Sequence, residues 1–240
     1  YSLYTQYQWA ILPNLSIVPG ARLDYDSQFN TEAIPKIGLR YQPWKTLVVR
    51  ASYGHGFRAP SFKELLLNFQ NPSAGYVVDG NPNLQPEFSE SMNVGAQLNL
   101  GVGIRSEINL FRNNLRNLIT TTSSTQNNSK GSSQFTYNNI GQARTEGIES
   151  KLDLQLSSLL SFKLAYTFTI AKDKTNNRPL QNTPKHRARL GLQAKLNITN
   201  SQIFTTLTYT GPRPFFHTMQ QDGAFMEKTA PPSFRLDFNF

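Results

Sequence analysis

The sequence contains no cysteine, has few charged residues for its length, and shows no long hydrophobic run. Its 240 residues include no Cys, and charged residues make up 16%. A chain without Cys cannot be a disulfide-stapled module, a zinc ribbon or an iron–sulfur protein, and it offers no thiol nucleophile. Apolar runs such as Leu65–Leu67 are only a few residues long, whereas a transmembrane helix needs roughly 20. A membrane-spanning helix is therefore excluded.

The first ten residues lack the basic, apolar and small-residue segments of a secretory signal peptide, and they already read as a β-strand. We therefore expect residues 1–240 to be one segment of a longer protein.

Basic residues outnumber acidic ones by 24 to 15, which gives a formal net charge of +9. The Lys and Arg residues are spread along the chain, and no RRM or OB-fold signature accompanies them, so we do not expect a nucleic-acid partner. Such a charge would instead attract anionic solutes or the phosphates of lipopolysaccharide.

Apolar and polar residues alternate with a period of two through most of the chain. Within 14–26, for example, Leu15, Ile17 and Leu23 lie at odd positions, and the small or charged residues Ser16, Gly20, Arg22, Asp24 and Asp26 lie at even ones. This period is typical of β-strands with two different faces. It predicts eleven strands, at 1–11, 14–26, 33–42, 46–57, 87–100, 102–119, 134–157, 159–171, 185–198, 201–212 and 231–240.

The links between these strands alternate between short and long. The short turns are expected at 12–14, 43–45, 101, 157–158 and 197–200, and the long links at 27–32, 58–86, 120–133, 172–184 and 213–230. Outer-membrane barrels alternate short periplasmic turns with long extracellular loops in the same way.

The polar positions of the strands carry many charges, which suits a wet lumen, and the apolar positions suit lipid. We therefore predict an all-β fold, an antiparallel transmembrane β-barrel. Because bacterial barrels have an even number of strands, eleven strands would form only part of one. The alternative is a soluble carbohydrate-binding β-sandwich, in which Trp9 and Trp44 would stack on sugars.

Catalytic signatures are weak. The segment Gly54–Ala59 fits a G-x-G-x-x-A dinucleotide fingerprint, but Pro60 interrupts the expected helix start and no second βαβ unit follows. The histidines His55, His186 and His217 have no metal-ligand spacing, and no G-x-S-x-G is present. We expect no catalytic residue, no metal site, no cofactor and no enzyme activity.

Three ordered motifs carry a family resemblance. They are YGHGFRAPSFKEL at 53–65, GNPNLQPE at 80–87 and YNNIGQARTEGIE at 137–149. Together they resemble the TonB-dependent outer-membrane receptor family over essentially the whole chain. The family motif residues are Phe57, Arg58, Ala59, Pro60, Asn81, Pro82, Asn83 and Leu84.

The resemblance implies a 22-stranded barrel closed by a plug domain, in the outer membrane of a Gram-negative bacterium. It would import a scarce small-molecule metal chelate or cofactor with energy from the inner-membrane TonB complex, and would contact outer-membrane lipid and lipopolysaccharide. Residues 1–240 would supply part of the barrel domain, without the plug, the first strands and the last two strands.

The ligand is expected to bind through the extracellular loops. A ferric siderophore is favoured over haem or cobalamin, because no His lies between residues 60 and 81, where the resembling haem receptors place a haem ligand. The candidate ligand-binding residues are Arg58, Phe69, Tyr76, Asp79, Asn81 and Arg213.

Overall fold

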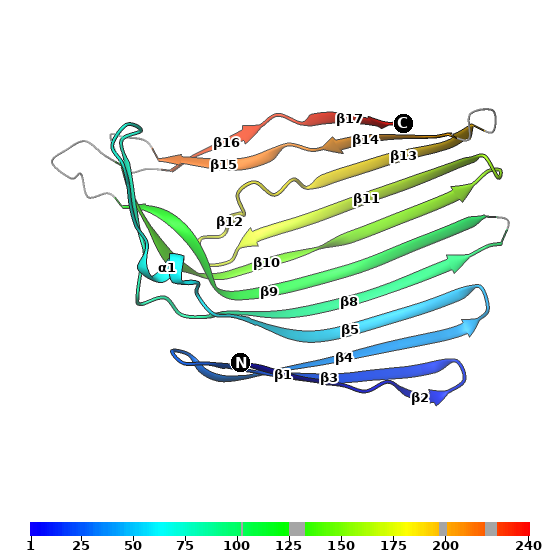
Figure 1. Ribbon diagram of the computed structural model, residues 1–240, viewed down its shortest axis with the longest axis horizontal. Helices are drawn as coiled ribbons and strands as arrows, with labels where there is room; N and C mark the ends of the chain where they lie inside the picture. The colour runs from blue at the N-terminus through cyan, green and yellow to red at the C-terminus, as the bar shows by residue number, and fades with distance from the viewer. Residues whose placement is uncertain (102, 125–132, 197–200, 219–224) are drawn as a thin grey trace.

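One large, curved β-sheet dominates the computed structural model of the chain, which describes residues 1–101, 103–124, 133–196, 201–218 and 225–240. The sheet has 15 strands, and its main path follows the order β1-β3-β4-β5-β8-β9-β10-β11-β13-β14-β17. All pairs along this path are antiparallel. Sequential strands lie side by side in Figure 1, which is the arrangement of an up-and-down barrel wall.

The eleven strands of this path confirm the eleven predicted ones, with ends shifted by a few residues. The first predicted strand is broken at residues 7–8 into β1 (Ser2–Gln6) and β2 (Trp9–Leu12), both paired with β3. The others are β3 (Leu15–Asp26), β4 (Asn30–Trp44), β5 (Leu47–Arg58), β8 (Glu87–Asn99), β9 (Ile104–Ser124), β10 (Ser133–Gln155), β11 (Leu160–Asp173), β13 (His186–Leu196), β14 (Ser201–Thr210) and β17 (Ser233–Asn239).

The predicted long link at 27–32 is wrong. The β3–β4 ladder continues to the pair Asp26↔Asn30, so only three residues form the turn. The Asp26 carboxylate accepts hydrogen bonds from the backbone N–H groups of Gln28 and Phe29 at 2.8 and 3.2 Å, and Asn30 takes a left-handed backbone with φ 64°. Asp and Asn are favoured in tight turns for these two reasons, so the alternation of link lengths does not hold here.

Three of the other predicted long links contain regular structure. The link 58–86 holds helix α1 (Phe62–Leu66) and the strands β6 (Asn68–Asn71) and β7 (Tyr76–Asp79). The link 172–184 holds β12 (Arg178–Pro179), and 213–230 holds the two-stranded sheet of β15 (Arg213–Thr218) and β16 (Phe225–Ala230). Most of the predicted loop 120–133, the short turn 197–200 and residue 102 lie outside the described residues.

The two faces of the sheet differ in chemistry, as the alternation predicted. Cross-strand partners share a face, and the register joins Val94, Leu110, Ile148 and Phe168 in one row. The opposite face joins Gly95, Asn109, Glu149 and Thr167. We call these the apolar face and the polar face.

Little of the chain is buried. Among the described residues, the buried hydrophobic side chains are only Ile34, Val48, Leu65, Leu84, Ile119 and Ala143, and large residues such as Leu110 and Ile148 are 50% and 40% exposed on the apolar face. A β-sandwich buries one face of each sheet against a second sheet, whereas the described residues leave large side chains of the apolar face exposed. The sandwich alternative is therefore not favoured.

Within the described ranges, no helix has the length and hydropathy needed to cross a membrane.

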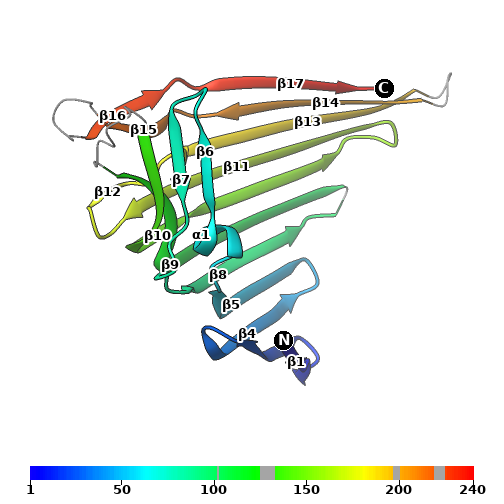
Figure 2. The ribbon, with the colours of Figure 1, turned by 60° about the vertical axis from the view of Figure 1, so that its left-hand side comes forward.

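The two ends of the sheet are also different. At one end the described residues between neighbouring strands form short turns, whereas α1, β6 and β7 fold across the other end, which we call the loop end (Figure 2). There β9 and β10 extend beyond their neighbours, and β7 pairs in parallel with residues 133–136 of β10. The segment 58–86 thus becomes a part of the sheet. The candidate residues between 57 and 84 all belong to this assembly or to the strand that enters it.

Candidate ligand-binding site

Helix α1 begins shortly after strand β5 ends at Arg58, and Ser61 is its N-terminal cap. Pro60 precedes Ser61, whose side chain accepts a hydrogen bond from the backbone N–H of Glu64, and the Glu64 carboxylate accepts one in return from the Ser61 N–H at 2.7 Å. This reciprocal capping box satisfies backbone donors that a helix start leaves free. A five-residue helix is marginal alone, so contacts with the rest of the loop end must hold it.

Arg58, the first predicted ligand-binding residue, ties α1 to the sheet. Its Nε donates to Glu87 at 2.5 Å, and its Nη1 donates to Glu64 at about the same distance from both carboxylate oxygens, 3.1 and 3.0 Å. The hydrogen bonds to Glu87 and then Glu64 raise the pKa of the Arg58 guanidinium. Burial alone would raise the pKa of the Glu64 carboxyl, but the hydrogen bonds from Arg58 and Ser61 outweigh it and lower that pKa.

Asn81, the second motif residue with an assigned ligand role, bonds to strand β10. Its Nδ2 donates to the carbonyl of Tyr137 at 2.9 Å, and its Oδ1 accepts from the backbone N–H of Asn83 at 3.0 Å. Asn139, two residues after Tyr137 in β10, accepts a hydrogen bond from the backbone N–H of Gln85 at 2.8 Å. Its Nδ2 donates one to the Gln85 carbonyl at 2.9 Å. Two asparagines from different motifs thus fasten the 81–85 segment along β10.

An apolar core fills the space between these polar links. Leu84 is 1% exposed and packs with Leu65 of α1 and Ile119 of β9, and Tyr137 packs against the same group. The three sequence motifs therefore converge in space, although they are up to about 80 residues apart. We call this assembly the motif cluster; its members are Arg58, Glu64, Leu65, Asn81, Leu84, Glu87, Ile119, Tyr137 and Asn139.

The hairpin of β6 and β7 presents aromatic rings beyond the motif cluster. The rings of Phe69 and Tyr76 lie 6.0 Å apart, and Tyr76 meets Phe135 of β10 edge-on at 6.4 Å. Asp79, at the end of β7, accepts a hydrogen bond from Gln134 at 2.9 Å. The structure thus brings together three predicted residues, Phe69, Tyr76 and Asp79, on one part of the loop end.

The remaining candidate, Arg213, starts β15 in the separate β15–β16 sheet and pairs with Ala230. Its Nε is buried and, within the described part of the chain, has no hydrogen-bond partner.

The described residues include no group of three or more His, Asp or Glu side chains that could hold a metal ion. His55 and His186 instead contact tyrosine hydroxyls, Tyr53 at 2.9 Å and Tyr166 at 2.7 Å. The side chain of His217 lies outside the described residues.

Asp173 is a buried charged group that the sequence reading did not single out. It is 2% exposed and accepts hydrogen bonds from Thr175, Asn176 and Arg178 at the loop end of β11. Burial alone would raise its pKa, but these hydrogen bonds, led by those from Asn176, lower it. Its role is to close the turn that follows β11.

Sequence reasoning also missed Phe135, Gln134 and Asn139. Phe135 and Gln134 follow a segment with no family motif, so only their pairing with β7 reveals them. Asn139 lies inside the motif 137–149. Two adjacent asparagines, Asn138 and Asn139, within a strand were a signal that could have indicated side-chain hydrogen bonds to a neighbouring backbone segment.

Comparison with known proteins gives a consistent result. The family model "TonB dependent receptor-like, beta-barrel" matches residues 1–239. An iron-regulated outer membrane virulence protein of Vibrio cholerae is 29% identical over 191 residues, covering 75% of this chain and 29% of that protein. A ferric enterobactin receptor, PirA of Pseudomonas aeruginosa, is 24% identical over 229 residues, covering 90% of this chain and 31% of that protein. Other matches are named for heme/hemopexin utilization in Haemophilus influenzae and vitamin B12 transport in Vibrio vulnificus.

Solved structures show the same architecture. A ferric enterobactin receptor of Pseudomonas aeruginosa, crystallised with enterobactin, superposes with a TM-score of 0.77 at 19% identity, covering 97% of this chain and 36% of that one. At this identity the likeness shows the fold alone. The chain spans less than a third of the length of the two curated relatives described above.

Proposed function

The chain belongs to the TonB-dependent receptor β-barrel family of the Gram-negative outer membrane, and we propose that it is part of an active-uptake receptor for a metal chelate. The observation that carries the proposal is the family match over residues 1–239. The apolar face would contact outer-membrane lipid and the polar face would line the barrel interior. The names of the matching relatives describe receptors and transporters, which supports a role without covalent chemistry.

The domain arrangement is also a proposal. The chain covers 36% of the chain of the solved enterobactin receptor, so further strands and a plug domain would come from other parts of the same protein. The plug would connect the receptor to the TonB complex at the inner membrane. In this arrangement residues 1–240 supply the wall and the loop end, but not the energy coupling.

For the ligand, we propose a ferric siderophore in preference to haem or cobalamin. The aromatic rings of Phe69, Tyr76 and Phe135 offer a surface on which a planar aromatic chelator can stack. Several relatives and solved neighbours are named as ferric siderophore receptors. Arg213 and the carboxylate of Asp79, which accepts one hydrogen bond from Gln134, would add polar contacts. Arg58 and Asn81 each bond two or more internal partners and would act by holding the hairpin in place.

The test uses the complete receptor, expressed in an outer membrane and supplied with ferric enterobactin, haem or cyanocobalamin. We expect energy-dependent uptake of the ferric chelate. Replacing both Phe69 and Tyr76 with Ala should weaken its binding roughly thirtyfold, because two stacking contacts of about 1 kcal/mol each are lost. Phe62→Ala is the matched control, since Phe62 is 81% exposed on α1 and no ring contact is described for it.

Two results would count against this proposal. Binding of the ferric chelate that is equal in the double variant and in Phe62→Ala would remove the aromatic hairpin from the ligand site. Uptake that continues in a strain without the TonB complex would contradict the proposed receptor class.

A further inference from the structure

Three basic side chains gather on one part of the polar face. The row that contains Thr167 continues to Arg187 on β13, and Arg189 lies two residues further along the same strand and therefore on the same face. Lys163 of β11 is a diagonal neighbour of Arg189, because its direct partner is Gly191. All three side chains are exposed. We call Arg187, Arg189 and Lys163 the basic stripe.

The basic stripe has little negative charge around it. The strands β11, β13 and β14 together contain one acidic residue, Asp173, whose carboxylate is buried and bonded within its own turn. Asp153 of β10 lies opposite Lys163 in the register. Among the described residues, however, no ion pair or hydrogen bond involves any side chain of the stripe, and none joins Lys163 to Asp153.

Other arginines of the polar face already have partners. Arg22 and Arg235 each form an ion pair with the aspartate two residues further on, at 2.9 and 3.0 Å. Arg50 donates to the side chain of Gln97 at 3.1 Å. The positive charge of the basic stripe is therefore available to a ligand, whereas that of these arginines is at least partly used within the wall.

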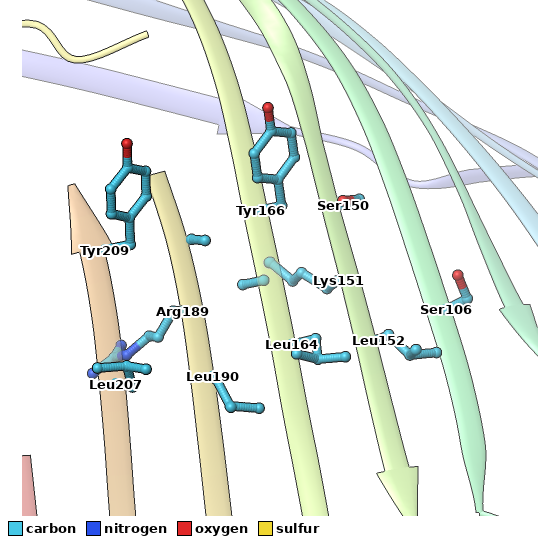
Figure 3. A pocket seen from close by; sticks show the side chains of 12 residues that line it. Ser106, Ser150, Lys151, Leu152, Leu164, Tyr166, Arg189, Leu190, Leu207 and Tyr209 are labelled. Carbon is cyan, nitrogen blue, oxygen red and sulfur yellow. The ribbon is translucent and has the colours of Figure 1, made fainter. Parts of the chain in front are cut away.

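Hydroxyl groups lie beside the two arginines of the stripe. The register pairs Arg187 with Thr210 and Arg189 with Thr208, both on β14. Figure 3 shows the side chain of Arg189 extending from β13 toward β14, whereas Leu190 points away from that strand. The Oγ1 atom of Thr208 is buried and has no hydrogen-bond partner within the described part of the chain. Guanidinium and hydroxyl donors together suit a ligand that is rich in acceptor oxygens.

The basic stripe begins next to the loop end. The N–H of Gly211 donates to the carbonyl of His186 at 2.8 Å, which joins the first residue of β13 to the segment that leads to Arg213. From Arg187 to the row of Lys163 is four residues, about 13 Å at roughly 3.3 Å per residue. A ligand that leaves Arg213 along this part of the wall therefore meets the basic stripe next.

We propose that the basic stripe is a second binding station for the metal chelate, inside the barrel and below the loop end, and that it selects chelates with a net negative charge. In such a chelate, carboxylate or catecholate oxygens carry more negative charge than the metal ion carries positive charge. Guanidinium and ammonium groups bind these oxygens through charge-assisted hydrogen bonds.

The station differs from the aromatic hairpin at the loop end in what it recognises. Rings such as Phe69 and Tyr76 stack on a flat ligand largely through its shape, whereas the basic stripe responds to its charge. The loop end would thus hold the chelate, and the stripe would decide which chelates pass along the wall. This inference rests on the proposed function, because it requires the polar face to line the interior of an uptake receptor.

The test uses the complete receptor, purified in detergent, and the anionic ferric complex of free catechol as the probe. Binding is measured by equilibrium dialysis. The test variant is Arg187→Gln with Arg189→Gln, and a second variant, Arg187→Lys with Arg189→Lys, keeps the charge. The matched control is Arg40→Gln with Arg50→Gln, which removes two arginines that lie opposite each other on the polar face of β4 and β5.

All receptors in this comparison, including the reference, also carry Phe69→Ala and Tyr76→Ala, so that stacking at the loop end does not contribute. Each variant is first shown to be folded by its heat-dependent electrophoretic mobility. We expect the test variant to bind the ferric catecholate roughly tenfold more weakly than the reference, a change of about 1.4 kcal/mol. The control and the lysine variant should bind nearly as well as the reference, and added salt should weaken binding more in the reference than in the test variant.

A second measurement follows ferric enterobactin in cells, with the aromatic hairpin intact. Arg187→Gln with Arg189→Gln should lower the rate of energy-dependent uptake roughly tenfold. The binding that de-energised cells retain at the loop end should stay the same, because the hairpin and Arg213 are unchanged. A variant that only damaged the fold would lose both.

Equal binding of the ferric catecholate by the test variant and the control would overturn the inference. So would the absence of binding in the reference, which would mean that carboxylates elsewhere in the receptor, such as those of the plug domain, already neutralise the stripe. The proposed function is judged separately, by uptake in the wild type. If uptake is absent while the stripe binds the ferric catecholate as expected, the proposed function fails and the anion site stands; normal uptake with equal binding in the test variant and the control gives the reverse.

Discussion

Leu110 lies within strand β9 and Leu84 lies just before strand β8, and the surroundings of the two leucines differ greatly. Leu110 is 50% exposed on the apolar face of the wall, whereas Leu84 is 1% exposed in the motif cluster. The wall is held by a backbone ladder that joins each strand of the main path to the next, and many apolar residues could occupy its outward positions. The motif cluster is held by particular side chains at particular places. The wall therefore tolerates change that the motif cluster does not.

The largest expected effect comes from Leu84→Ala. Removing a fully buried leucine side chain should cost about 3 kcal/mol in the local free energy of unfolding, because the cavity beside Leu65 and Ile119 cannot collapse completely. Hydrogen exchange of the amides in 58–87, measured on the complete receptor, reports this cost. Leu110→Ala is the matched control. An equal loss of protection in the two variants would remove the contrast between the wall and the motif cluster.

Gly147→Ala tests whether every position of the wall accepts a larger side chain. A Cβ at Gly147 would lie 2.0 Å from the Phe168 carbonyl oxygen and 2.9 Å from the Phe111 ring, whereas one at Gly38 would lie 3.8 Å from Val18. We expect Gly147→Ala to destabilise the β10–β11 ladder by about 2 kcal/mol, and Gly38→Ala to have little effect. The denaturant midpoint of each refolded receptor is the measurement. Equal midpoints would show that the ladder can shift to accept a side chain.

The third effect concerns the ion pairs of Arg58. Arg58→Gln leaves Glu64 and Glu87 without their shared cation, and should cost about 1 to 2 kcal/mol in the stability of α1, less than for a fully buried group because the Arg58 side chain is 46% exposed. Arg58→Lys should restore part of this stability, since Lys keeps the positive charge but lacks the guanidinium group that bonds Glu64 and Glu87 at the same time. Limited proteolysis near residue 62 measures the difference. No change with Gln would show that the capping box alone holds α1.

The contrast also explains what the sequence could predict. Strand positions follow from a period of two that each strand carries within itself, so all eleven strands of the main path were found. The short turn at 27–29 was missed because its Asx turn depends on the two residues Asp26 and Asn30 and not on a periodic pattern. The strands β6 and β7 were missed because they form only by pairing with each other and with the distant segment 133–136.

The candidate site was predictable to a similar extent. The three motifs identified the family and most residues of the motif cluster. Their spacing did not show that Asn139 bonds to Gln85, or that Phe135 meets Tyr76, since both contacts join segments that are far apart in the chain. The sequence thus indicates single candidate residues. Which of them are in contact depends on the pairing of β7 with β10.

The smallest expected effect is that of acid, which should lower the stability of the motif cluster before that of the wall. The pKa values of Glu64 and Asp173 are lowered in the folded protein, so their contribution to stability is complete above the ordinary carboxyl pKa and is lost as the pH falls through the lowered values. As the pH falls below the ordinary carboxyl pKa of about 4, amides of α1 should lose protection before those of β10 at 148–155. Hydrogen exchange corrected for intrinsic rates tests this, with Glu64→Gln as the control. That variant lacks the titrating carboxyl, so α1 should already be less protected at neutral pH and should change less on acidification. An α1 that loses protection equally with and without Glu64 would assign the acid sensitivity to another group.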